Sequence, residues 1–243
     1  MRQTPCSAEV IAHRGASALA PEHTYDAYDL AVAQGADVLE LDIRPTLDRQ
    51  LLVIHDQTLA RTAGDVRSVA ALTRADIERL PAAVRPLTLA AVLERYGGTI
   101  RLLLELKDPA PHWEGLVVDA VERHGIADRV ALQAFGVPAL RRLRLRAPGL
   151  HLSSLHWRRP SSRTLDAVSR CATSVGVAHH AADPGLVAAA HARGLAVSAW
   201  TVNSRATIDR VLAAGVDALI TDVPDVAIAA SVVPPPALVP QAA

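Results

Sequence analysis

The sequence has 243 residues, half of them hydrophobic but only 3 % aromatic, so its core must consist mainly of Leu, Val, Ile and Ala. Its 25 basic and 25 acidic residues cancel, which excludes bulk affinity for nucleic acid, because that requires a basic excess or a basic stripe. A chain of this length forms either two small domains or one α/β barrel.

Signals for disulfides, export and membrane insertion are missing from the sequence. Cys6 and Cys171 show no CxxC spacing, which argues against a zinc site or a disulfide framework. The first residues, MRQTPCSAEV, contain no apolar segment typical of a signal peptide. No run reaches the roughly 18 apolar residues of a membrane span. We therefore predict a cytoplasmic protein with no transmembrane segment.

Apolar strand-like runs alternate with helical patterns along the chain. Helical patterns separate most of the runs, and several of them end at a glycine, which adopts the left-handed backbone at a helix C-terminus without a steric cost. This alternation predicts parallel βαβ units. The predicted strands are 9–13, 37–43, 51–55, 99–106, 129–135, 150–155, 174–179, 196–202 and 217–221.

The second and third predicted strands depart from this alternation. Only residues 45–50 separate them, whereas a parallel crossover needs about a dozen residues or more. Strand 51–55 should therefore return antiparallel to strand 37–43, with a turn near Asp48. The eight remaining strands predict an α/β fold, a (β/α)8 TIM barrel with an extra antiparallel hairpin strand after the second barrel strand.

The remaining segments complete the predicted domain organisation. Residues 57–87 show a weak helical pattern and no clear strand, and we predict that they form a connection over the top of the barrel. The last residues are rich in proline. We predict a single barrel domain over residues 1–232 and a disordered tail over residues 233–243.

Polar side chains gather where the predicted parallel strands end, which is the edge at which barrels of this kind carry their chemistry. Strand alternation places Glu40 and Asp42 together on an inner face, and Glu105 and Lys107 on another. The hairpin returns His55 to the same place. The strand ends carry His13, Arg14, Glu40, Asp42, Glu105, Lys107, Gln133, Ser154, His179, Trp200 and Asp222.

Two interpretations of the three carboxylates compete. Either they form an internal ion-pair network with Arg14 and Lys107, or they hold a metal ion. Three carboxylates and two basic groups leave one negative charge, which favours a divalent cation, and ligands that are all oxygen favour Mg²⁺ or Ca²⁺ over zinc. Histidines near such a cluster are suited to move protons near neutral pH, and the whole set fits hydrolysis of a phosphate ester.

Taken together, the motifs resemble those of the glycerophosphodiester phosphodiesterases. The matching segments occur in the order of the family and are IAHRGASALAPEHT, ELDIRPTLDRQLLVIHDQTLART, LELK, AWTVN and GVDALITDVPD. The resemblance implies a barrel that hydrolyses glycerophosphodiesters to an alcohol and sn-glycerol 3-phosphate.

The resemblance also implies a role for each residue of the site and a divalent metal ion, Mg²⁺ or Ca²⁺, as cofactor. The implied partner is a small-molecule glycerophosphodiester and not nucleic acid, and the oligomeric state stays open. The implied roles are acid and base for His13 and His55, metal ligands for Glu40, Asp42 and Glu105, phosphate binding for Arg14 and Lys107, and substrate binding for Trp200 and Glu22.

Several interpretations stay open beside this one. His23 stands where the family usually has Asn, which could alter the position of Glu22 or of Arg14. The segment after His55 is short compared with members that carry a cap, which leaves glycerol recognition by a cap in question. The loop 156–163 could bind a substrate headgroup, although a solvated surface is the simpler interpretation. Asp222 could merely cap the helix that follows it.

Two alternative functions also remain. A sphingomyelinase-D-like phospholipase, acting on a lysophospholipid or another phosphodiester, would use a similar pair of histidines and similar acidic residues. A barrel that binds phosphate without catalysis is an alternative of a different class.

Overall fold

Eight parallel strands close into a ring in the computed structural model, which describes residues 8–232. Strand β1 pairs with both β11 and β2, and this closes the barrel. The predicted TIM barrel is confirmed. The ring consists of β1 (Glu9–His13), β2 (Val38–Pro45), β6 (Arg101–Leu106), β7 (Val130–Phe135), β8 (His151–His156), β9 (Ser174–Ala178), β10 (Ala196–Trp200) and β11 (Ala218–Thr221).

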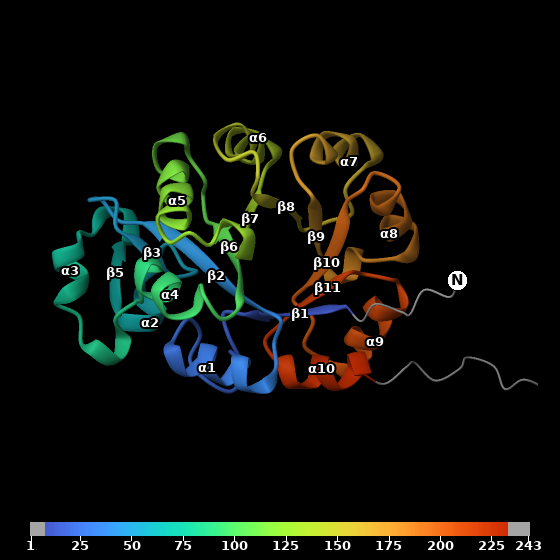
Figure 1. Ribbon diagram of the computed structural model, residues 1–243. Coiled ribbons are helices and arrows are strands. Elements are labelled where there is room, and N and C mark those ends of the chain that lie inside the picture. The colour runs from blue at the N-terminus through green and yellow to red at the C-terminus, as the bar shows by residue number, and fades with distance from the viewer. Residues whose placement is uncertain (1–7, 233–243) are drawn as a thin grey trace, which may run out of the picture.

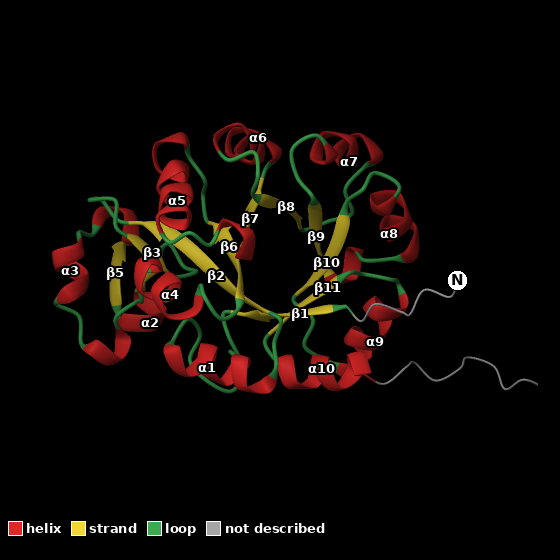
Figure 2. Ribbon diagram, in the orientation of Figure 1, coloured by secondary structure: helices red, strands yellow, loops and turns green. Residues whose placement is uncertain are grey.

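A layer of helices surrounds the ring (Figures 1 and 2). Side-chain caps set several helix starts, as at Thr24, whose hydroxyl accepts from the Ala27 N–H, and α1 ends at Gly35 with φ 91°. The outer helices are α1 (Tyr25–Gln34), α4 (Leu89–Tyr96), α5 (Pro111–Arg123), α6 (Val137–Arg146), α7 (Ser162–Ser169), α8 (Pro184–His191), α9 (Arg205–Ala213) and α10 (Pro224–Val232).

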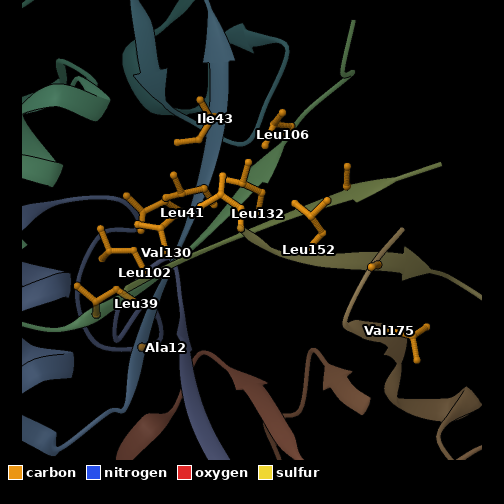
Figure 3. Close-up of a cluster of buried hydrophobic side chains, with 14 of the residues drawn as sticks. Ala12, Leu39, Leu41, Ile43, Leu102, Leu106, Val130, Leu132, Leu152 and Val175 are labelled. Carbon is orange, nitrogen blue, oxygen red and sulfur yellow. The ribbon is translucent and has the colours of Figure 1, made fainter. Parts of the chain in front are cut away.

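Alternation along the strands separates two apolar layers. Leu39 and Leu41 of β2 point outward into the main core beneath the helices, beside Leu102 of β6 (Figure 3). Val38 and Leu103 belong instead to a smaller cluster inside the barrel. The inner face is therefore apolar at the start of β2 and β6 and becomes polar toward their C-terminal ends, where the candidate site lies.

Strand β3 (Leu51–Val53) is the predicted return strand. It pairs antiparallel with β2, and the pairs Ile43 with Val53 and Pro45 with Leu51 are symmetric about Asp48, as expected. The Ile54 N–H then donates to the Asp42 carbonyl at 2.8 Å, so the chain reaches His55 beside the end of β2.

The segment after β3 differs from the prediction. It contains two short strands, β4 (Thr58–Leu59) and β5 (Asp65–Ser68), paired antiparallel, with the helices α2 (Ala60–Ala63) and α3 (Arg74–Glu78). It lies beside the barrel, next to β3, rather than over its top (Figure 1). The expectation of no strand was wrong because runs of two and four residues are too short to show alternation. The short 3-10 helices are η1 (Val69–Ala71), η2 (Ala82–Val84), η3 (Ala127–Arg129) and η4 (His179–Ala181).

The inserted segment packs on an apolar cluster of its own. This cluster is separate from the two barrel layers and consists of Leu52, Ile54, Leu59, Val69, Leu72 and Ile77. The predicted tail, residues 233–243, lies outside the described residues. No helix among residues 8–232 is both long enough and apolar enough to cross a membrane.

Candidate active site

Three carboxylates meet inside the barrel at the C-terminal ends of β2 and β6. Asp42 pairs in register with Glu105, and Glu40 lies two residues before Asp42 on the same inner face. Each carboxylate contributes one oxygen to a group of three, and these three oxygens all lie within 4.8 Å of one another. Glu40 and Asp42 are fully buried, and Glu105 is nearly so. The structure thus brings together the three acidic side chains that alternation placed on inner faces.

Asp42 lies between two cations. Lys107 Nζ is 2.9 Å from Asp42 Oδ1 and also contacts Glu105, while Arg14 Nε is 3.1 Å from Asp42 Oδ2. Burial opposes ionisation, but a hydrogen bond from His23 and the charges of His23, Lys107 and Arg14 hold the pKa of Asp42 well below its usual range. The internal ion-pair network that the sequence allowed is therefore present around Asp42.

Glu40 is left out of that network. It accepts only long hydrogen bonds, 3.2 Å from the Arg14 N–H and 3.4 Å from Gln133 Nε2, and it forms no salt bridge with the described residues. Burial, followed by the charges of Asp42 and Glu105, raises the pKa of Glu40 well above its usual value. A buried carboxylate needs a proton or a cation to offset its desolvation, and the two basic side chains do not supply one to Glu40.

The donor set fits a hard divalent cation. Three carboxylates offer oxygen atoms at short mutual distances, and Mg²⁺ and Ca²⁺ both prefer oxygen ligands. One further buried oxygen nearby, Gln133 Oε1, accepts no hydrogen bond from the described residues. The ion-pair and metal interpretations are therefore compatible, because the ion pairs account for Asp42 and Glu105 and leave Glu40 for a cation.

Each of the two predicted proton carriers is held by a carboxylate. Nδ1 of His13 lies 2.6 Å from Asp222 Oδ1, and Nδ1 of His55 lies 2.8 Å from Asp56 Oδ1. Because an ionised carboxylate only accepts hydrogen bonds, Nδ1 carries the proton in both rings and Nε2 stays free to exchange a proton with a ligand. The side chains are 19 % and 38 % exposed, so both are accessible from the mouth.

Asp222 does more than precede α10. Its Oδ1 also accepts from the Ser17 hydroxyl at 2.9 Å, and its Oδ2 accepts from Asn203 Nδ2 at 2.5 Å. Describing Asp222 as a helix cap misses its contact with His13. The available signal was the closed barrel itself, which places the end of the last strand next to the end of the first.

Arg61 of α2 joins the inserted segment to the site, a role that no pattern in the sequence predicted. It donates to both oxygens of Glu22, at 2.7 and 2.8 Å, and to Asp56 Oδ2 at 2.8 Å. The hydrogen bond from Arg61 is the main reason that the pKa of Asp56 falls to about 2. Glu22, predicted to bind substrate, lies between Arg61 and Arg14, with Arg14 Nη1 at 3.3 Å.

An aromatic wall stands on the β7–β10 side of the mouth. It consists of Phe135, Trp157 and Trp200, with ring centroids 4.6 to 5.9 Å apart. Phe135 is two residues beyond Gln133 on the same face of β7, about 7 Å along the strand from the side chain that reaches Glu40. The chain's only Phe and two of its three Trp lie in this wall, and Trp157 is 64 % exposed.

The loop after β8 combines two kinds of residue. Arg159 pairs with Asp183, which fits the solvated surface expected for this loop. Trp157, however, stacks on Phe135 with an interplanar angle of 15°, so it belongs to the mouth of the barrel. His23, which the sequence suggested could alter the position of Glu22 or Arg14, directs its ring to Asp42, with Nε2 3.0 Å from Oδ2, while its N–H donates to the Arg14 carbonyl at 3.1 Å.

Comparison with known proteins assigns the family. A protein-family model described as the glycerophosphoryl diester phosphodiesterase family matches residues 13–226. The chain belongs to this family. It is thereby classed with the phosphoric diester hydrolases, as the motifs indicated.

Relatives and solved structures agree with this assignment. The chain is 32 % identical over 229 residues to a glycerophosphodiester phosphodiesterase of Caldanaerobacter subterraneus, covering 89 % of this chain and 94 % of the relative. A crystal structure of a glycerophosphodiester phosphodiesterase from Agrobacterium tumefaciens superposes with a TM-score of 0.80 at 28 % identity, covering 91 % of this chain and 99 % of that one.

A third match carries a ligand. An Oleispira antarctica phosphodiesterase, solved in complex with its product sn-glycerol-3-phosphate, superposes with a TM-score of 0.82 at 25 % identity. The match covers 91 % of this chain and 96 % of the Oleispira chain.

Proposed function

We propose that this chain hydrolyses glycerophosphodiesters to an alcohol and sn-glycerol 3-phosphate with the help of a divalent metal ion. The observation that carries the proposal is the meeting of the buried carboxylate cluster with two carboxylate-held histidines at one end of the barrel. The glycerol-3-phosphate complex of the Oleispira relative supports this substrate class. The cytoplasmic location stays a prediction from the sequence, as does the extent of the domain, 1–232.

Glu40, Asp42 and Glu105 are the proposed metal ligands. A divalent cation held by them would stabilise the negative charge that develops on the phosphoryl group. Arg14 and Lys107 already lie against Asp42, and we assign them contacts with the phosphate oxygens because fixed cations in a site that excludes water stabilise such charge strongly.

His13 and His55 are the proposed acid–base pair. One removes a proton from the nucleophile, and the other donates a proton to the departing alkoxide, which is a poor leaving group without it. Asp222 and Asp56 keep Nδ1 protonated, so each ring presents Nε2 for this exchange.

The decisive experiment measures sn-glycerol 3-phosphate released from glycerophosphocholine and glycerophosphoethanolamine, with Mg²⁺, Ca²⁺ or a chelator. We expect release that chelator abolishes and added metal restores. No release with either metal would overturn the proposal. Hydrolysis of lysophosphatidylcholine to choline, without release of sn-glycerol 3-phosphate from the glycerophosphodiesters, would favour the sphingomyelinase-D-like alternative. Binding of phosphate without any hydrolysis would favour a barrel that binds phosphate without catalysis.

The pH dependence of metal binding offers a second check. Burial raises the pKa of both Glu40 and Glu105, so the folded metal-free protein retains protons at a pH where an ordinary glutamate, with its value of 4.5, has lost them. A cation must displace these protons, so affinity should rise with pH above 4.5 and level off beyond the raised pKa values. Titration calorimetry in two buffers of different ionisation enthalpy should detect proton release below neutral pH; its absence would contradict the ligand assignment.

The aromatic wall should contact the alcohol part of the substrate. Trp157→Ala removes its exposed ring, and a lost contact with a trimethylammonium group, worth about 1 to 2 kcal/mol, would raise KM for glycerophosphocholine roughly 5- to 30-fold. We expect kcat to change little, as measured by initial rates. Leu145→Ala on α6, where the side chain is 85 % exposed, is the control and should leave KM unchanged. An unchanged KM for Trp157→Ala would place the alcohol elsewhere.

A further inference from the structure

His23 is a buried histidine in direct contact with a proposed metal ligand. Its side chain is only 5 % exposed, with Nε2 3.0 Å from Asp42 Oδ2 and Nδ1 2.8 Å from the hydroxyl of Tyr28. Tyr28 is itself fully buried, in α1. The ring therefore bridges a helix of the outer layer and a carboxylate inside the barrel, with both nitrogens occupied.

The backbone fixes the place of this ring. His23 has φ 57°, in the left-handed region that is uncommon for residues other than glycine but that Asn, Asp and His adopt more often than the rest, and its N–H donates to the Arg14 carbonyl at 3.1 Å. The next residue, Thr24, caps α1. His23 is thus held between the loop that carries Arg14 and the first turn of α1, which leaves its ring little freedom to turn away from Asp42.

The direction of the hydrogen bond to Asp42 follows from geometry. An ionised carboxylate can only accept, and Arg14 Nε and Lys107 Nζ, at 3.1 and 2.9 Å, favour the ionised form. Nε2 of His23 must therefore carry a proton and donate it to Oδ2. The Tyr28 hydroxyl can donate to Nδ1 or accept from it, so this arrangement holds whether the ring is neutral or charged.

The contact orients the Asp42 carboxylate. His23 and Arg14 both lie against Oδ2, while Oδ1 faces Lys107, which also contacts Glu105. A carboxylate held at one oxygen presents the other in a fixed direction. Outer partners of this kind orient metal ligands in many proteins, and their loss commonly costs about 10- to 100-fold in metal affinity.

We propose that His23, braced by Tyr28, is a positioning residue that holds Asp42 in the orientation required for binding the divalent cation. This inference rests on the proposed function, because it concerns the same metal site. It extends that function by assigning two residues, one in the loop before α1 and one in α1, to the stability of the metal complex rather than to contact with substrate.

The test measures binding of the metal alone, Mg²⁺ or Mn²⁺, by titration calorimetry. His23→Leu fills the space without a donor and should weaken binding about 10- to 100-fold. His23→Gln, whose terminal amide can donate to Asp42 at a similar reach, should stay within about fivefold of the parent. Tyr28→Phe removes one oxygen and should weaken binding several-fold, because it frees Nδ1. Each loss should also appear as a higher metal concentration for half-maximal rate, with kcat at saturating metal changed much less.

His191→Leu provides the matched control. His191 Nε2 lies 2.8 Å from Asp217 Oδ2 on the outside of the barrel, so this variant removes the same kind of histidine–carboxylate contact away from the site. It should leave metal affinity unchanged. Circular dichroism checks the fold, and if His23→Leu does not fold, Tyr28→Phe decides the question with a smaller change.

The outcomes separate this inference from the proposed function. Suppose the parent binds metal and His23→Leu binds it within twofold as tightly; this would overturn the role of His23 alone. If His23→Leu does not fold, the same result with Tyr28→Phe would overturn it. Equal weakening in His23→Gln and His23→Leu would show that the ring fills space rather than donating a hydrogen bond, and would also overturn it. A parent that binds neither Mg²⁺ nor Mn²⁺ would overturn the proposed metal site, and this inference with it.

Discussion

His13→Ala and His55→Ala should each lower kcat by roughly two to four orders of magnitude with the fold intact, because each removes one of the two proposed proton carriers from the transition state. Both side chains are partly exposed, so little core packing is lost. The measurement is sn-glycerol 3-phosphate release at saturating substrate and metal. Full activity in both variants would show that the acid–base assignment is wrong.

A substrate with a better leaving group should separate the two roles. A p-nitrophenyl ester of glycerol phosphate needs little protonation as its alcohol departs, so the variant that lacks the general acid should lose much less activity on it. The variant that lacks the base should lose as much as before. Equal losses of activity on both substrates in both variants would contradict the assignment of one histidine as acid and the other as base.

Asp222→Asn adds a third test of the acid–base pair. An amide no longer requires a proton on His13 Nδ1, so kcat should fall while KM changes little.

Glu40→Gln should have opposite effects on metal binding and on stability. Metal affinity should fall by more than the roughly 10- to 100-fold that loss of an outer partner costs. The metal-free protein, however, should become more stable near neutral pH. The pKa of Glu40 is raised on folding, so its ionisation opposes folding at any pH above the unfolded value of 4.5, and glutamine has no such charge to bury. Thermal unfolding with and without Mg²⁺ measures both effects.

Asp42→Asn is the informative comparison. The pKa of Asp42 is lowered on folding, so its charge stabilises the fold at all pH values above its ordinary pKa. Its removal leaves Arg14 and Lys107 facing a neutral amide, a change that costs about 3 to 5 kcal/mol for a buried pair. Both variants should lose the metal-induced rise in Tm, but only Asp42→Asn should unfold at a lower temperature without metal. A Glu40→Gln protein less stable than the parent without metal would contradict the unfavourable burial of the Glu40 carboxylate that raises its pKa.

Alternation made much of the site predictable from the sequence. Because successive strand side chains face opposite sides, Glu40, Asp42 and Glu105 had to share the inner surface once β2 and β6 were recognised as neighbours. The short hairpin fixed the place of His55 for the same reason, since its register follows from the turn.

Other contacts depend on geometry that no local pattern contains. Arg61 reaches Glu22 and Asp56 from a four-residue helix in a segment with little periodicity. The ring of His23 meets Asp42 because a left-handed residue redirects the chain before α1, and a single backbone angle leaves no periodic signal. The sequence placed His23 near the site without identifying its partner, and nothing in it indicated that Arg61 belongs to the site.

The contact between His13 and Asp222 links the two ends of the folded chain, 209 residues apart in sequence. It exists only while β11 is paired with β1, and the proposed role of His13 in proton transfer would make the reaction rate depend on that pairing. Under mild denaturant, turnover should therefore fail as soon as the final strand and helix detach, before most of the helical signal is lost. Loss of activity would then measure opening of the barrel. A chain shortened by its last strand and helix would lack Asp222, the residue that holds the proton on His13 Nδ1.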